Sequence, residues 1–478
     1  MRENTVTRKR TSRQDYGVIG LILALLAASW CNPAQAQEKA EQEKMELASA
    51  IFGPPAPLHA RQTTAQQQRE DNIGLPDAIA IAVTRHPDIA RALAAQARGR
   101  ADLGSARSVW MPSVSYSANI GPNMFDSYNN SSLNNNMQGP SIALNQLVWD
   151  FGRAQSDIQA ASAVERQRHF ELSATADQIA EKTALAYLDI TRADMMHRES
   201  ERQLKELERL RDLIRMRAKA GISDQSDLVL AEVRIEGARA DVIQADANLT
   251  ASKAELVNLI GIMPTGYDNP APIFEQFQDD MGEPDFDSLP IVASANENKE
   301  ASSARINFAR AERYPRLGLQ LGYSHNNYSY ESRDNALTAV ITVKGDLYQA
   351  GTTHRVEAAQ QDRHAARAEK EAIILNIKGQ IHMAREAIRG GVSRIGIYQN
   401  QEEKAVAARD IFIEEYKLGK RSLFDLLNAE QEIYRAASAR VMAQIDVMRA
   451  RVELYSAYGL LRTTLGIVDT LAKADRHE

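Results

Sequence analysis

The fold is decided by the stretch GKRSLFDLLNAE at residues 419–430. An earlier stretch, GISDQSDLVLAE at residues 221–232, repeats its Gly, Asp-Leu and Ala-Glu at the same spacings. Each copy follows a long helical pattern and supplies a glycine, Gly221 or Gly419, where a helix end favours positive φ. A capping-box-like pattern, Asp-x-x-Asp or Ser-x-x-Asp, then begins a new helical run. We therefore expect a long helical hairpin with a tight, charged tip in each half of the chain.

Upstream of each tip, the two halves repeat the same order of patterns. Apolar and polar residues alternate with period two after Pro112 and around residues 317–323 and 337–343, and a further extended run spans residues 142–151. Together these patterns predict four strands. A polar loop is expected between the strands of each pair, at residues 326–335 in the second half. Each half thus reads helix, strand, strand, long helix, tip, return helix, and the chain is an internal two-fold repeat.

The long helix of each half exceeds any ordinary globular helix. About 67 residues at 1.5 Å each give a rod on the order of 100 Å, which needs lateral partners as in coiled coils. The pair Gly390-Gly391 weakens the second rod and is expected to mark a bend.

The N-terminus has the pattern of an export signal. A basic segment precedes a short apolar core at residues 18–28, and Ala34-Gln35-Ala36 is a small-residue cleavage signature. Cleavage would remove Cys31, the one cysteine, and leave no disulfide framework. We expect a signal peptide at 1–36, a disordered leader at 37–72, a first repeat at 73–261, a connector at 262–290, a second repeat at 291–460 and a C-terminal tail at 461–478.

Composition and motifs exclude several classes of function. The net charge of −6 gives no reason to expect nucleic acid, and the nine histidines lack metal-ligand spacing. The sequence has no phosphate-binding glycine loop, nucleophile elbow or HExxH motif, so we expect no enzyme, no cofactor and no metal. No mature stretch is apolar enough for a membrane helix, so a membrane span would need strands.

Four strands are too few to close a barrel, because membrane barrels begin at about eight. An open sheet would also leave unpaired backbone groups in lipid. Several copies would therefore share one barrel, and three copies would supply about twelve strands. The alternative is a small sheet on a soluble, exported coiled-coil protein.

The duplicated strand pairs and the Gly-x-Arg-Ser-x-x-Asp-Leu-Leu-x-Ala-Glu tip resemble the TolC family of outer-membrane channel-tunnels. The resemblance runs from Ile73 to about Leu460. It implies a mainly α fold in which long hairpins form a periplasmic tunnel, and a homotrimer with a twelve-stranded β-barrel in outer-membrane lipid. It also implies two partners, a periplasmic adaptor protein and an inner-membrane ABC or RND transporter.

The resemblance further implies a gate at the tips. The second tip is the moving hairpin and the first is its anchor, so that Asp227 accepts from Tyr416 and Lys420, while Ser226 faces Arg421. The alternative is that the tip carboxylates are ordinary helix caps and the basic residues a solvated face.

The pore constriction is expected at Asp425, which matches the carboxylate that constricts the pore in the family. Repetition by symmetry would make a ring that attracts cations. A second carboxylate of the family pattern is replaced by Asn428, which predicts milder cation selectivity.

Three functions stay open, and the first two are what the resemblance implies. The first is a passive, gated exit duct of a type I protein secretion system, and the wording Lys420-Arg421-Ser422-Leu423 favours this reading. The second is the outer-membrane component of a tripartite multidrug efflux pump. The third is an exported structural coiled-coil protein without a transport role.

Overall fold

The computed structural model describes residues 72–118, 137–219, 224–329 and 332–467, which form one unit. The expected signal peptide, nearly all of the expected leader, Gly221 and most of the expected tail lie outside the described residues. The predicted domain boundaries therefore stay predictions.

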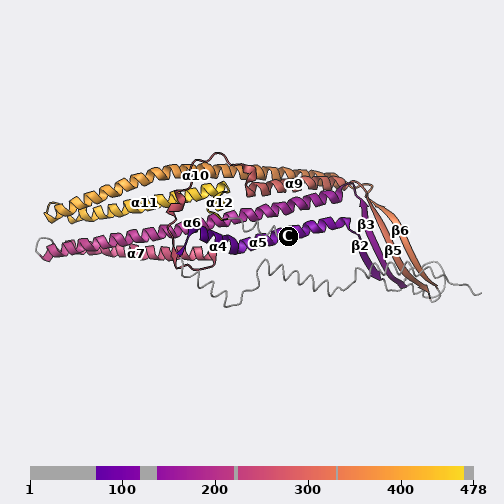
Figure 1. Ribbon diagram of the computed structural model, residues 1–478, viewed down its shortest axis with the longest axis horizontal. Coiled ribbons are helices and arrows are strands. Elements are labelled where there is room, and N and C mark those ends of the chain that lie inside the picture. Colours follow the sequence, from indigo (N-terminus) through magenta and orange to yellow (C-terminus); the bar gives the residue numbers. More distant parts are fainter. Residues whose placement is uncertain (1–71, 119–136, 220–223, 330–331, 468–478) are drawn as a thin grey trace, which may run out of the picture. The chain divides into compact units, whose positions relative to one another are not determined.

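Long helices make up most of the described chain (Figure 1). They are α4 (Leu75–Arg85), α5 (Pro87–Arg107), α6 (Arg153–Lys219), α7 (Gln225–Ile260), α9 (Pro290–Ala311), α10 (Gly351–Lys417) and α11 (Leu423–Ala457). The break between α4 and α5 falls at His86, whose backbone is extended because a residue before proline is disfavoured in the helical region.

Both predicted hairpins are present. α6 and α10 are 67 residues long, and each is followed by a return helix, α7 or α11, that packs against it. Gly419, at the end of α10, has a φ of +73°, a conformation that glycine adopts without the penalty a side chain would bring. Figure 1 shows the two hairpins side by side, and α6 of the first also packs against α11 of the second.

The four predicted strands form one antiparallel sheet in the order β2-β3-β5-β6. Their bounds are Ser113–Ala118, Met137–Trp149, Arg316–Ser329 and Ser332–Lys344. β5 and β6 continue through most of the loop predicted at residues 326–335, where Asn326 still pairs with Asp334. That prediction was wrong because a hairpin ladder needs only backbone groups, which polar residues supply as well as apolar ones.

A small second sheet ties the start of the described chain to the middle. β1 (Asn72–Ile73) pairs in parallel with β4 (Gly266–Tyr267). The buried hydroxyl of Tyr187, on α6, lies 2.8 Å from the carbonyl oxygens of both Ile73 and Asp268, which share its one hydrogen. Burial raises the pKa of Tyr187, so the hydroxyl stays protonated as a donor.

The segment after β4 is also attached to the helices, although its sequence predicts only a connector. It contains α8 (Ala271–Phe274) and a 3₁₀ turn, η2 (Phe286–Ser288). Phe277 packs against Tyr455 of α11 with 4.0 Å between ring centroids. Arg451 of α11 forms a two-pronged ion pair with Asp279 at 2.7 and 2.8 Å.

The predicted tail begins with a packed turn of helix, α12 (Leu461–Thr464). Leu461 is buried, and the Arg462 guanidinium donates to Asp177 of α6 at 2.6 Å. None of the helices in the described ranges is long and apolar enough to cross a membrane.

Candidate gate at the hairpin ends

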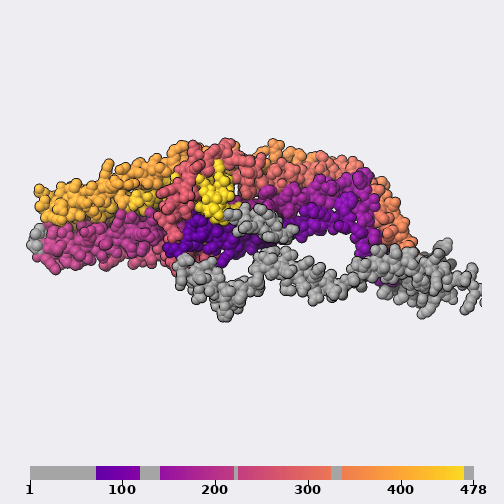
Figure 2. All heavy atoms as spheres, in the orientation of Figure 1, coloured from indigo at the N-terminus to yellow at the C-terminus, as the bar shows by residue number. Residues whose placement is uncertain are grey.

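The ends of the two hairpins share one hydrophobic cluster, called here the tip cluster. It joins residues of α6, α7, α10 and α11, the four helices of the two hairpins. Its buried members are Leu207, Leu210, Ile214, Ala231, Ile235, Ala238, Tyr416, Leu423, Leu426 and Leu427. The space-filling view shows the surfaces of the two hairpins meeting toward these ends (Figure 2). Separation of the hairpins would therefore expose apolar surface to water.

Arg217, in the last turn of α6, bridges the two hairpins. Its Nη1 donates to the carbonyl oxygens of Tyr416 at 2.6 Å and of Lys417 at 2.7 Å, at the end of α10. Its guanidinium also lies 4.6 Å from the centre of the Tyr416 ring. A cation suits this place because the last carbonyls of a helix lack intrahelical partners and carry partial negative charge. Arg217 was not predicted from the sequence, since a basic residue in the last turn of a helix is common.

Arg421 is folded back onto its own hairpin. Its Nε donates to Glu415 at 3.0 Å, and its guanidinium lies over the ring of Phe412 at 4.1 Å. A longer ion pair of 3.9 Å reaches Asp425. Within one chain, Arg421 thus stiffens the tip of the second hairpin.

The two predicted capping boxes differ. The hydroxyl of Ser422 accepts from the backbone N–H of Asp425 at 3.2 Å and donates to its carboxylate at 2.8 Å, so this cap is confirmed. Asp224 occupies the corresponding cap position of α7, but its side chain makes no cap hydrogen bond. Asp425 therefore acts as a helix-capping partner within the single chain.

The other predicted gate residues have different environments. Tyr416 is buried in the tip cluster, whereas Ser226, Lys420 and Asn428 are exposed and Asp227 is half-buried. The predicted contacts of Asp227 with Tyr416 and Lys420, and of Ser226 with Arg421, stay predictions.

The glutamate that ends the repeated motif is buried in one copy and exposed in the other. Glu430 is buried, at 3% exposure, and pairs with Arg409 of α10 at 3.2 Å, while Glu232 is exposed. Burial raises the pKa of Glu430 above its ordinary value, and the nearby Arg409 guanidinium offsets this only in part. The glutamate of the motif is therefore buried only in the second half.

Within the described residues, no group of three or more His, Cys, Asp or Glu side chains could hold a metal ion. The arrangement at the tips is one of helix caps, ion pairs and apolar packing. These noncovalent contacts can hold the two hairpins together or let them separate.

Two long hairpins per chain, a four-stranded sheet and an internal repeat define a channel-type transport protein of the outer membrane. The family model for outer membrane efflux proteins matches residues 78–262 and 288–460. The chain belongs to this family, which includes TolC, and the prediction of a non-enzymatic transport protein is confirmed by that membership.

Several characterised relatives match most of the chain. Protein CyaE of Bordetella pertussis is 22% identical over 71% of this chain and 74% of its own length. Outer membrane protein TolC of Vibrio cholerae is 22% identical, covering 75% and 84%. Alkaline protease secretion protein AprF of Pseudomonas aeruginosa is 24% identical, covering 84% and 86%.

Solved structures show the same fold. CusC superposes with a TM-score of 0.73 at 16% identity, over 80% of this chain and 91% of that one. The outer-membrane channel OprN gives a TM-score of 0.70 at 19% identity, over 80% and 89%. The predicted fold of long hairpins and four strands is thus confirmed.

Proposed function

We propose that three copies of this chain form a gated exit duct of a type I protein secretion system. The observation that carries the proposal is one sheet of four strands joined to two long hairpins, in a chain whose two repeats both match the efflux family. Twelve strands from three copies would close the sheet, because β2 and β6 each have one edge that pairs with no other described strand. An inner-membrane ABC transporter and a periplasmic adaptor would drive export.

Protein export is favoured by one relative that matches over most of its length. AprF is named for secretion of an alkaline protease, and it covers the largest share of this chain among the relatives described above. A second candidate function is drug efflux with an RND transporter, since the family is described by efflux and BepC of Brucella suis is named an efflux protein. Membership of the family weighs against the third candidate, a structural coiled-coil protein.

The experiment that separates the first two functions uses a host that lacks its own channel of this family. The chain is expressed with an ABC transporter, its adaptor and a protein substrate, or with an RND pump and adaptor. We expect the substrate protein in the medium and no recovery of drug resistance. Recovery of resistance without protein export would favour efflux, and a monomer that is soluble without detergent would contradict both.

The tips would form the gate. Links from Asp227 to Tyr416 and Lys420, and from Ser226 to Arg421, would hold the second hairpin against the first or against a neighbouring copy. Exposed pairs of this kind contribute about 0–1 kcal/mol each, so several copies of a weak link suit a gate that an adaptor opens. The double variant Asp227→Ala with Arg421→Ser should raise single-channel conductance in planar bilayers. Unchanged conductance would exclude the latch.

The constriction would be a ring of Asp425 side chains, one from each copy, with Asn428 one turn further along α11. The Asp425 carboxylate is 42% exposed in the single chain, so it is accessible to ions. A ring of three carboxylates attracts cations, and the asparagine limits the formal charge. Bilayer recordings at neutral pH should show mild cation selectivity, and anion preference would contradict the ring.

A further inference from the structure

The two faces of the second strand pair differ in character. In an antiparallel pair, residues directly opposite one another share a face, and the face changes at each step along a strand. One face carries Leu317, Leu319, Leu321 and Tyr323 of β5, and opposite them Val343, Ile341, Ala339 and Leu337 of β6. The other face carries Arg316, Gly318, Gln320, Gly322 and Ser324, and opposite them Lys344, Thr342, Val340, Thr338 and Ala336. The first face is thus apolar, and the second is polar or small except at Val340.

The polar face is the one that would line the proposed channel. Membrane barrels place apolar residues outward toward lipid and polar residues inward. Leu337, Ile341 and Val343 of the apolar face are 66, 74 and 65% exposed in the single chain, which fits a face that lipid covers. In the proposed trimer, Arg316 and Lys344 would therefore face the lumen.

Arg316 and Lys344 differ from the rest of this face by their charge. They are the only charged residues among the strand residues whose side chains the structure describes. They lie directly opposite each other, where β5 begins and β6 ends, at the end of the sheet that joins the helices (Figure 1). Like charges at opposite positions destabilise a strand pair, so folding does not explain why both are cations.

Within the described residues, neither of these side chains forms an ion pair or a hydrogen bond. Glu312, in the linker before β5, is already bonded to Arg153 at 2.9 Å and to Arg355 at 2.7 Å. Asp346, in the linker after β6, is exposed. Burial, and after it the positive charge of Arg316, lowers the pKa of Arg153 at the start of α6. The positive potential at this end of the sheet therefore reaches the neighbouring helix.

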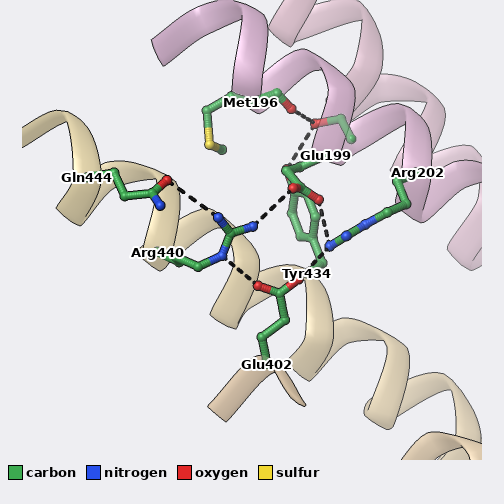
Figure 3. A network of polar contacts seen from close by, with 8 residues as sticks. Met196, Glu199, Arg202, Glu402, Tyr434, Arg440 and Gln444 are labelled. Atoms are coloured by element: carbon green, nitrogen blue, oxygen red, sulfur yellow. Dashed lines mark hydrogen bonds and ion pairs between the residues drawn. The ribbon is translucent and has the colours of Figure 1, made fainter. Parts of the chain in front are cut away.

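Elsewhere the chain pairs neighbouring cations with carboxylates. Arg202 of α6 and Arg440 of α11 share Glu199 and Glu402 (Figure 3). Arg202 lies 2.7 Å from Glu199 and 3.0 Å from Glu402. Arg440 lies 3.5 Å and 2.8 Å from the same two carboxylates. The two cations of the sheet have no such partners in the described chain, so they can attract an anion from outside it.

We propose that Arg316 and Lys344 of all copies form a ring of positive charge in the lumen, where the sheet meets the helices, and that this ring attracts acidic segments of an exported polypeptide. Fixed charges of one sign in a confined passage raise the local concentration of the opposite sign. Exposed ion pairs contribute about 0–1 kcal/mol each, so a passing carboxylate would be held weakly and released. The ring rests on the proposed channel function. It lies in series with the proposed Asp425 ring at the tips and has the opposite sign.

Ion selectivity of the purified full-length channel tests the ring. Reversal potentials across planar bilayers of neutral lipid, measured in a salt gradient, give the permeability ratio of potassium to chloride. Lys344→Gln and Arg316→Gln should each raise this ratio about two-fold at 0.1 M salt, and the effect should shrink at 1 M because ions screen the charges.

Lys404→Gln is the matched control. Lys404 is exposed, and among the described residues it forms no ion pair. At 1.5 Å per residue, it lies about 80 Å along α10 from the end that joins the sheet. The control removes the same charge per copy and should leave the permeability ratio unchanged. An equal shift in the control would overturn the proposal, because the position of the charge would not matter.

A peptide probe measures the attraction directly. An oligo-glutamate peptide added from the side of the sheet reaches the ring without passing the tips. In the double variant Arg316→Gln with Lys344→Gln, it should interrupt the single-channel current on the order of ten-fold less often than in the wild type. An oligo-lysine peptide of the same length should not interrupt the wild-type current more often than oligo-glutamate does. Equal block by oligo-glutamate in variant and wild type would overturn the proposal.

Two further measurements separate the ring from other roles. The difference between variant and wild type should be the same in anionic lipid, and a difference that depends on lipid charge would show that the cations bind headgroups instead. Lys344→Gln should unfold at the same temperature as the wild type or higher, because it removes a repulsion. A lower midpoint would show that Lys344 has a partner within the protein, which overturns the ring. A channel of unchanged selectivity refutes the ring alone, whereas the absence of any channel refutes the proposed function and the ring with it.

Discussion

Replacing Arg217 by methionine tests whether α6 holds the end of α10. Methionine keeps most of the aliphatic packing but removes two hydrogen bonds from a charged donor to the carbonyls of Tyr416 and Lys417. Such bonds contribute about 1.5–3 kcal/mol when shielded, but Arg217 is only half-buried, so water replaces part of the loss. We expect a net cost of about 2 kcal/mol, which corresponds to roughly 30-fold more frequent opening of the tip.

The measurement is amide hydrogen exchange of residues 413–427 in the purified full-length protein, because exchange reports local opening directly. Protection should fall in that segment and stay unchanged at α9 and the start of α10. Arg215→Met is the control, since among the described residues Arg215 makes an ion pair only to Asp212 of its own helix, at 3.5 Å. If both variants exchanged like the wild type, the reasoning that Arg217 joins the hairpins would be refuted.

Three further predictions concern single residues. Tyr187→Phe should cost about 1 kcal/mol, because the carbonyls of Ile73 and Asp268 lose the Tyr187 hydroxyl as a hydrogen-bond donor, and a lower thermal midpoint by circular dichroism would show it. Asn428→Asp should strengthen block of the proposed channel by divalent cations in bilayer recordings. Equal block in the variant and the wild type would show that Asn428 does not line the pore. Burial disfavours the charge of Glu402, but hydrogen bonds from Arg440 and Arg202 outweigh it and hold the pKa of Glu402 below its ordinary 4.5. The stability from this ionised group is present above about pH 4.5 and is lost as pH falls through the lower folded pKa, so thermal stability should decline in acid less steeply in Glu402→Gln.

Local patterns predicted the helices and strands of this fold well, because the periodicity of each is visible in consecutive residues of the sequence. The glycine at the end of α10 and the cap at Ser422 are examples, since their physics involves only neighbours in the chain. The strand limits were less predictable, as β5 and β6 pair through polar residues that resemble a loop.

Contacts between the halves could not be predicted, because the sequence does not state how two long helices are aligned along their length. Arg202 meets Glu402 across 200 positions of the chain, and neither residue differs in type from its solvated neighbours. The β1–β4 pairing is two residues long on each side, too short for any period to show. The repeated motif therefore located the candidate gate, but it did not predict the hydrogen bonds that Arg217 makes from one hairpin to the other.

The tip cluster has a consequence for how the protein matures. Leu207, Leu210 and Ile214 lie in the first half, but Leu423, Leu426 and Leu427, which cover them, are made about 200 residues later. At about 5–20 residues per second, the first hairpin would wait roughly 10–40 s with its apolar stripe uncovered if export kept pace with synthesis. A newly exported chain is thus most prone to aggregation in this interval, and a holding chaperone that binds the stripe of α6 would protect it.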